Sequence, residues 1–254
     1  MTLSVVVITY NEEASIRRLL ESVRPADEHV VLDCGSTDRT LEIARAFGAR
    51  IFAEKWKGYS AQKNSAIEKA TGDWVLSLDA DEAVEPELME EIRRVLDHNP
   101  PVDGYYIPRK NYFLGRWIRH GGFYPDRKLR LFRRGRGRFG ERPVHEVVQV
   151  DGPTGTLNHA LVHNAYPTLE SYITHMNRYS SLGAEIAAEK GKTRFRLLNI
   201  VINPLATFLY NYFLRLGLLD GREGLLLHLY HSAYVSWKYA KAWELARAAR
   251  PEPR

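Results

Sequence analysis

The first hundred residues alternate short apolar runs with segments in which apolar side chains recur every three or four positions. The apolar runs predict four buried strands, at residues 3–9, 30–32, 51–53 and 74–78. The segments with three-to-four spacing predict four helices, at residues 13–23, 39–47, 61–70 and 87–96. Strands that alternate with helices of this length are typical of a mostly parallel sheet covered by helices on both faces, so we expect an α/β fold.

The pattern changes beyond residue 100. Residues 104–150 combine short apolar runs with glycine-rich turns, and aromatic side chains there alternate with cations. Residues 109–142 contain twelve Lys or Arg side chains against only Asp126 and Glu141, a bias that fits phosphate binding. A solvated basic face is the alternative interpretation.

We expect a domain at residues 1–165, followed by a helical segment at 166–254. Within that segment, residues 195–219 are strongly apolar but carry polar side chains at helical spacing, at Arg196, Asn199, Asn203 and Thr207. A membrane-spanning helix needs about twenty consecutive apolar residues, so this pattern predicts amphipathic helices lying in a membrane interface instead. Alternatively, the apolar faces pack on the main domain or join copies of the chain into a homo-oligomer.

Composition narrows the classes of protein. The 254 residues are 44% hydrophobic and 26% charged, which indicates a globular chain rather than a disordered one. A formal charge of +5 and a pI near 9.2 favour polyanionic partners such as nucleotides, anionic lipids or nucleic acid. The single cysteine, Cys34, cannot form an intrachain disulfide, and the apolar run at 5–8 is too short for a signal peptide, so we expect a cytoplasmic protein.

Acidic residues follow three of the predicted strands. Asp79 and Asp81 come directly after the run at 74–78, and two carboxylates at this spacing can hold a divalent cation that clamps a diphosphate. The segments 9–12 and 33–38 end the strands at 3–9 and 30–32. Because ligands of such sheets bind beyond the carboxyl ends of the strands, we expect the three segments to converge on one crevice.

With these motifs, and with Trp56-Lys57-Gly58-Tyr59 and Gln62-Lys63-Asn64, the chain resembles the family 2 glycosyltransferases of the GT-A fold. The Tyr-Pro-Asp and Leu-Arg-Leu-Phe-Arg-Arg segments extend the resemblance to the subgroup of lipopolysaccharide-core β-glucosyltransferases. It implies a Rossmann-like, mostly parallel sheet, with a nucleotide-binding half at 1–100, an acceptor and catalytic half at 101–165, and a helical amphipathic extension.

The resemblance also implies roles for individual residues. The nucleotide of the donor is expected to contact Thr9, Tyr10, Asn11, Glu12, Asp33, Lys63 and Asp79. A Mn²⁺ or Mg²⁺ ion is expected on Asp81 and Asp79. Asp33 suits its role because a carboxylate can accept the ring N–H of uracil, although a turn or helix cap is the alternative, and Cys34 stands where family members often have a second Asp.

An inverting transferase needs one carboxylate to deprotonate the acceptor hydroxyl. By resemblance, Asp126 is the first candidate for this base, because it precedes Arg127 and Gly135 as the acidic residue does in the family. Glu146 is the alternative base, with His145 as a phosphate or metal ligand. Arg130 and Arg133 are expected to bind donor or acceptor phosphate.

The expected activity is transfer of a hexose from a nucleotide sugar, most simply a UDP-sugar, to a glycan or lipid-linked acceptor of the cell envelope, at the inner face of the membrane. A sugar-phosphate nucleotidyltransferase is the nearest rival, but residues 9–13 lack its glycine-rich, Arg-containing loop. A nucleic-acid-binding module is the second rival. It leaves Asp33, Asp79 and Asp81 unexplained, so we expect no nucleic-acid partner.

Overall fold

The computed structural model describes residues 1–140 and 147–248. The chain forms two compact units, the first made of Met1–Lys110 and Asp126–His163, the second of Asn111–Pro125 and the chain from Asn164 onward. The second unit thus begins near the boundary expected at residue 165, but it also includes residues 111–125, which were expected in the catalytic half.

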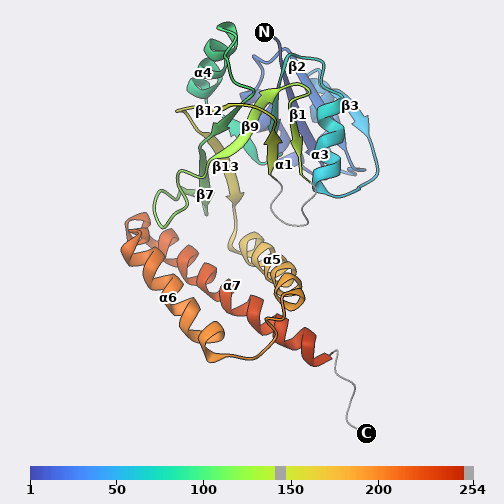
Figure 1. The fold of residues 1–254 in the computed structure, drawn as a ribbon. Coiled ribbons are helices and arrows are strands. Elements are labelled where there is room, and N and C mark those ends of the chain that lie inside the picture. Colours follow the sequence, from blue (N-terminus) through green and yellow to red (C-terminus); the bar gives the residue numbers. More distant parts are fainter. Residues whose placement is uncertain (141–146, 249–254) are drawn as a thin grey trace. The chain divides into compact units, whose positions relative to one another are not determined.

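The first unit is built on a seven-stranded sheet with the order β12-β6-β9-β4-β1-β2-β3 (Figure 1). Its strands are β1 (Leu3–Thr9), β2 (Glu28–Asp33), β3 (Arg50–Ala53), β4 (Trp74–Leu78), β6 (Gly104–Ile107), β9 (Lys128–Arg133) and β12 (Thr154–Thr156). Strands β4, β1, β2 and β3 are parallel, as expected, whereas β9 runs antiparallel to β4 and β6.

Helices cover both faces of this sheet. Successive side chains of a strand point to opposite sides, so a continuous apolar strand offers both faces an apolar surface on which helices can pack. Val5 and Val7 of β1 pack in the cluster that includes residues of α1, α2 and α4, while Val6 packs in the cluster that includes α3. These helices are α1 (Glu13–Ser22), α2 (Thr40–Ala46), α3 (Tyr59–Glu68) and α4 (Pro86–Asp97). All four helices expected from the first hundred residues are present, with ends shifted by at most two residues.

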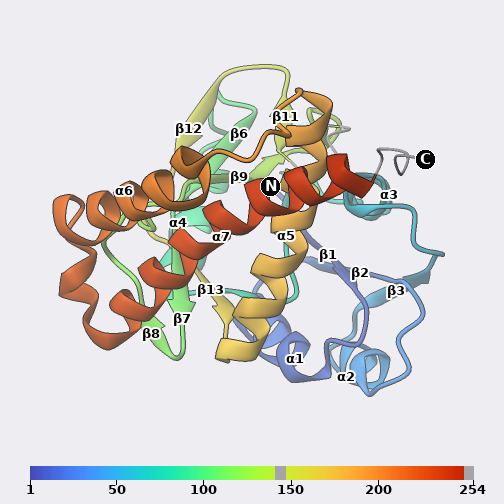
Figure 2. The same cartoon turned by 90° about the horizontal axis from the view of Figure 1, so that it is seen from below.

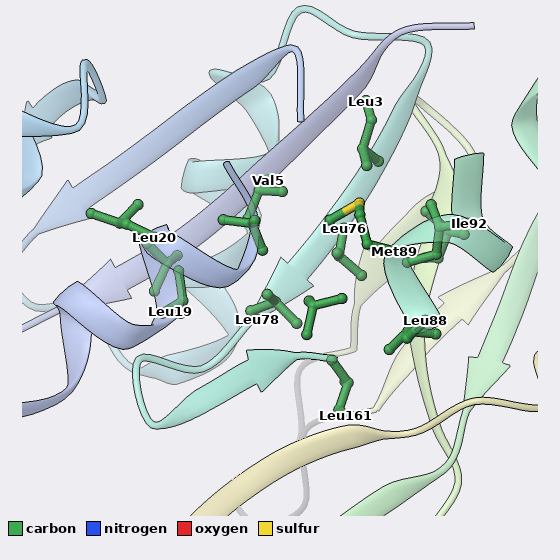
Figure 3. Packing of buried hydrophobic residues seen from close by; sticks show 14 of the residues in the cluster. Leu3, Val5, Leu19, Leu20, Leu76, Leu78, Leu88, Met89, Ile92 and Leu161 are labelled. Atoms are coloured by element: carbon green, nitrogen blue, oxygen red, sulfur yellow. The ribbon is translucent and has the colours of Figure 1, made fainter. Parts of the chain in front are cut away.

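Leucine side chains hold α1 and α4 against the strands (Figure 3). Leu19 and Leu20 of α1 and Leu88 of α4 are at most 1% exposed, and they contact the same cluster as Leu76 and Leu78 of β4. Complete burial of a leucine contributes about 1.5–3 kcal/mol, so this layer fixes the sheet whose strand ends carry the candidate site.

Short strands complete the first unit. They are β5 (Glu82–Val84), which pairs with residues 161–163 of β13 (Leu161–Tyr166), and the two-stranded sheet of β10 (Gly137–Phe139) and β11 (Val148–Val150). The chain passes between the units within β7 (Arg109–Phe113) and within β13.

The second unit is mainly helical. It contains the hairpin of β7 with β8 (Arg116–Trp117), and helical elements α5 (Leu169–Glu189), the π-helical turns η1 (Leu198–Ile202) and η2 (Tyr210–Leu214), α6 (Asn203–Leu209), the 3-10 turn η3 (Gly217–Asp220) and α7 (Gly221–Ala248). Helices α5 and α6 each pack against α7 (Figure 2). Among the described residues, no helix has the length and apolar content needed to cross a membrane.

Candidate functional site

The carboxyl ends of β1 and β2 bring two of the expected nucleotide residues together. Thr9 and Asp33 are register partners on these parallel strands, and the Thr9 hydroxyl donates a hydrogen bond of 3.0 Å to Asp33 Oδ1. Asp79 follows β4, the neighbour of β1 on the other side. The structure therefore confirms the expected convergence of these strand ends.

Asp33 organises the turn that follows β2. Its carboxylate is 1% exposed and accepts hydrogen bonds from the backbone N–H groups of Gly35 and Ser36, both at 2.8 Å, and from the Ser36 hydroxyl. Burial raises the pKa of Asp33, but these hydrogen bonds outweigh it and leave the pKa below its ordinary value. Asp33 thus has the turn role that the sequence left open as an alternative.

The loops after β1 and β2 are joined by further hydrogen bonds. Asn11, in the left-handed region with φ of 54°, donates its N–H to the Ser36 hydroxyl and accepts from the Thr37 N–H with its side-chain carbonyl, both at 2.8 Å. Glu12 donates its N–H to the Thr40 hydroxyl at 2.7 Å. Asn11 and Glu12 therefore hold the two loops as one surface, on which Tyr10 is 60% exposed.

Asp79 lies between two cations. Its Oδ1 is 2.6 Å from Lys63 Nζ of α3, and its Oδ2 accepts a hydrogen bond from Arg130 of β9. Burial raises the pKa of Asp79, but Arg130 and then Lys63 outweigh that effect and hold the pKa well below its usual range. Both oxygens of Asp79 are therefore already bound to protein cations.

The buried Glu82 extends this charge network to Asp126. Glu82 is fully buried and accepts hydrogen bonds from Arg130 at 2.8 Å and from Arg109 at 3.1 Å. Arg109 donates two hydrogen bonds to Asp126 Oδ2, at 3.0 and 2.6 Å. A chain of alternating charges therefore connects the acidic end of β4 with the candidate base.

Asp126 is held as an anion. Lys128 Nζ is 2.9 Å from its Oδ1, so each carboxylate oxygen contacts a cation. Burial raises the pKa of Asp126, but Arg109 and Lys128 overcome this and lower it to about 2. The carboxylate is thus ionised and able to accept a proton, although it is a weak base in the absence of substrate.

Asp81 has a different partner. Its Oδ2 is 3.2 Å from Nε2 of His163 on β13. Burial raises the pKa of Asp81, and its interaction with His163 more than compensates, so the pKa lies below its ordinary value. Two ligands of an octahedral cation at about 2.1 Å from the metal are about 3 Å apart, so this pair fits a divalent ion.

Protein side chains alone do not complete a metal site. No group of three or more His, Cys, Asp or Glu side chains suited to a metal occurs within 1–140 and 147–248. Mg²⁺ and similar ions commonly take their remaining ligands from substrate phosphates and water. Asp81 and His163 are thus compatible with an ion that arrives with a diphosphate.

Glu12 lies in a strongly negative environment. Burial is the main cause that raises its pKa to about 7, and Asp81, Asp38 and Asp79 raise it further, while a hydrogen bond with Ser15 opposes them. A cation beside Asp81 would offset this repulsion. It would therefore lower the pKa of Glu12 and favour its ionised form.

Two arginines that were expected to bind phosphate instead contact other protein groups. Arg130 is 6% exposed, and its guanidinium serves Asp79 and Glu82. Arg133 pairs with Trp74, the first residue of β4, and donates to the carbonyls of Pro100 and Val102, so it lies at the opposite end of β4 from Asp79. The alternative site residues His145 and Glu146 lie outside the described residues.

Sequence reasoning missed three members of the network, namely Glu82, Arg109 and His163. Glu82 stands one residue after Asp81, and a carboxylate so close to the acidic pair was an available signal. His163 lies in an apolar segment 82 positions further along the chain, and only its pairing with β5 brings it to Asp81. Periodicity could not reveal that contact.

Comparison with known proteins identifies the family of this chain. The model for glycosyl transferase family 2 matches residues 4–151. The lipopolysaccharide core biosynthesis glycosyltransferase LpsC of Rhizobium meliloti (strain 1021) is 32% identical over 260 residues, covering 99% of this chain and 96% of LpsC. An uncharacterized glycosyltransferase, RT0209 of Rickettsia typhi, is 31% identical over 266 residues, covering 98% and 89% respectively.

Among solved structures, S. aureus TarS 1–349 in complex with UDP is similar at a TM-score of 0.49 and 19% identity, covering 100% of this chain and 93% of that one. The family match includes more than half of the 254 residues, and the relatives share nearly the whole length. The chain therefore belongs to glycosyl transferase family 2 and has its GT-A fold.

Proposed function

We propose that this protein is an inverting, metal-dependent glycosyltransferase that moves a hexose from a UDP-sugar to a lipid-linked glycan of the lipopolysaccharide core, at the inner face of the membrane. The observation that carries the proposal is the meeting of Asp79, Asp81, His163 and Lys63 beyond the carboxyl ends of parallel strands. The acceptor class is supported by the name of the similar LpsC protein.

In this proposal the loops at 9–12 and 33–38 bind the nucleoside. Asp33 positions Thr9 and the turn at Gly35, and exposed Tyr10 offers a ring on which a base can stack. Lys63 is the cation proposed to bind the donor phosphates, and its ion pair with Asp79 supports this by holding its ammonium group at the end of β4.

A divalent ion would be held by Asp81 and His163. When bound, it neutralises the charge that develops on the leaving diphosphate. Asp79 acts indirectly here, because Lys63 and Arg130 already occupy its two oxygens.

Asp126 acts as the base. The acceptor oxygen forms a bond to the anomeric carbon, the bond from that carbon to the diphosphate breaks, and the hydroxyl proton passes to Asp126. Asp126 is a weak base, because its pKa is about 2. The proton is therefore transferred late in the displacement, when the forming bond to the anomeric carbon has made the acceptor hydroxyl strongly acidic. A single displacement of this kind inverts the anomeric centre.

The test is an assay of product formation with the full chain. UDP-, GDP-, CDP- and dTDP-sugars are incubated with Mn²⁺ and lipopolysaccharide-core acceptors, and the released nucleotide is identified. Acceptor-dependent release of UDP supports the proposal. Release of pyrophosphate from a nucleoside triphosphate and a sugar phosphate, without transfer, would instead identify a nucleotidyltransferase.

A further inference from the structure

The helical stretch formed by η1, α6 and η2, residues 198–214, has its polar side turned inward. Four polar side chains at four-residue spacing are half-buried along it, namely Asn199, Asn203, Thr207 and Asn211. They bond within the stretch, since Asn203 Nδ2 donates to Asn199 Oδ1 at 3.1 Å and Thr207 donates to the Asn203 carbonyl at 2.8 Å. Ser236 of α7 also donates to the Ile200 carbonyl at 2.9 Å, so α7 packs beside it.

The apolar side chains of the same stretch point outward. Large hydrophobic residues on it are between 44% and 75% exposed, namely Leu198, Val201, Ile202, Leu205, Leu209, Tyr210, Phe213 and Leu214. A helix at the surface of a water-soluble unit normally shows the opposite arrangement, with its apolar stripe toward the core. The exposed stripe therefore indicates an apolar partner, and we name residues 198–214 the docking face.

The length of the docking face suits a position along a membrane surface. Seventeen helical residues extend about 25 Å, less than the roughly 30 Å of a bilayer's hydrocarbon core. Its exposed leucines and aromatic residues are those with which interfacial helices enter the boundary of the acyl chains.

Charge identifies the kind of surface. Residues 190–219 include five cations, Lys190, Lys192, Arg194, Arg196 and Arg215, and no Asp or Glu. Lys192, Arg194 and Arg196 also line a hollow of about 460 Å³ together with Asn199 and Tyr239. Cations beside an apolar face complement anionic headgroups, whereas pairing two copies through this face would bring like charges together.

We propose that the docking face binds the surface of an anionic lipid bilayer, with its apolar stripe in the acyl boundary and the neighbouring cations at 190–196 on lipid phosphates. This deepens the proposed function, which places the reaction at the inner face of the membrane, by naming the part of the chain that binds there. The evidence for it lies within the second unit and does not depend on the donor site.

The test is co-sedimentation of the full chain with vesicles of phosphatidylcholine alone or mixed with phosphatidylglycerol. We expect binding to the mixed vesicles, weaker binding to the neutral ones, and loss of binding at high salt. The double variant Leu205→Glu with Leu209→Glu should bind at least about tenfold more weakly, because it places two charges in the apolar boundary. Arg194→Glu with Arg196→Glu should remove the preference for phosphatidylglycerol.

Ile173→Glu and Leu245→Glu are matched controls, since both are exposed aliphatic side chains that lie outside the docking face. They should bind vesicles like the unmodified protein, and circular dichroism should show every variant folded. Equal binding of the Leu205 and Leu209 double variant would overturn the proposal. So would absence of lipid binding together with a dimer that this variant converts to monomer, which would assign the face to a second copy.

Failure of this proposal can be distinguished from failure of the proposed function. Vesicle binding is measured without donor, metal or acceptor. A chain that binds vesicles but transfers no sugar would contradict the proposed transfer reaction alone. A chain that transfers sugar without binding vesicles would contradict the docking face and the membrane location, but not the transfer reaction.

Discussion

Among single residues, Asp126 carries the clearest chemical prediction. Asp126→Asn removes the proposed proton acceptor but retains a side chain of the same size, so the turnover rate should fall by about a hundredfold or more while donor affinity stays near that of the unmodified protein. The measurement is steady-state transfer combined with donor titration. Glu146→Gln is the matched variant, and a full loss of turnover there, with normal activity in Asp126→Asn, would move the base to Glu146.

Glu12 gives a prediction about pH. Its pKa in the folded protein, about 7, lies above the ordinary 4.5, so folding favours the protonated form. The stability that this group contributes is therefore complete below about pH 4.5 and is lost as the pH rises through 7. Glu12→Gln should raise the melting temperature at pH 8 relative to the unmodified protein but not at pH 4. Identical differences at both pH values would contradict the raised pKa.

Residues at the site differ in how far the sequence could reveal them. Thr9, Asp33, Asp79 and Lys63 were expected together because strand ends and short motifs fix their neighbours. The partners of Asp79 were not predicted, because Arg130 reaches it from β9, an antiparallel strand 51 positions away. The position of Arg133 was not predicted for the same reason. The sequence pattern of β9 does not show that Arg133 lies beside the start of β4 rather than beside the end that carries Asp79.

At the scale of elements, Asp220 joins the start of α7 to the loop after β8. This carboxylate is 2% exposed and accepts hydrogen bonds from the N–H groups of Arg119 and His120, at 3.1 and 2.8 Å, and lies 3.0 Å from His120 Nδ1. Asp220→Ala removes a buried acceptor from these partly buried donors, so we expect a loss of about 1–3 kcal/mol in the free energy of unfolding.

Urea denaturation measures that loss. Glu185→Ala, at an exposed position of α5, is the control and should change the free energy by less than about 0.5 kcal/mol. A value for Asp220→Ala as small as that of the control would show that the carboxylate does not secure the loop.

Elements with a clear apolar pattern were predicted best. The strands β1 and β4 follow from continuous apolar runs and the helices α1 and α4 from their apolar spacing, and burial in one core explains both patterns. Strands of three residues such as β5, β10 and β12 were not predicted individually, because three positions are too few to show a period. The antiparallel β9 in the sheet was also missed, since sequence patterns do not specify the order of strands.

At the scale of the whole molecule, the two units divide the proposed work. The first unit contains the proposed donor site, and the second contains the proposed docking face. The double variant Leu205→Glu with Leu209→Glu should therefore transfer sugar to a water-soluble acceptor, without detergent, at a rate within about twofold of that of the unmodified protein. Its transfer rate to the same glycan anchored in vesicles should be about tenfold lower than that of the unmodified protein. Equal losses with both acceptors would contradict this division.

Calorimetric titration of the protein with UDP-sugars, first with Mn²⁺ and then with EDTA, tests whether a metal-dependent donor site lies at this end of the sheet. We expect binding that disappears on chelation and is weakened at least about tenfold in Asp81→Asn and in His163→Gln, with the melting temperature of both variants preserved. Metal-independent binding of equal strength in the unmodified protein and in both variants would contradict the assignment of the donor and metal site to this end of the sheet.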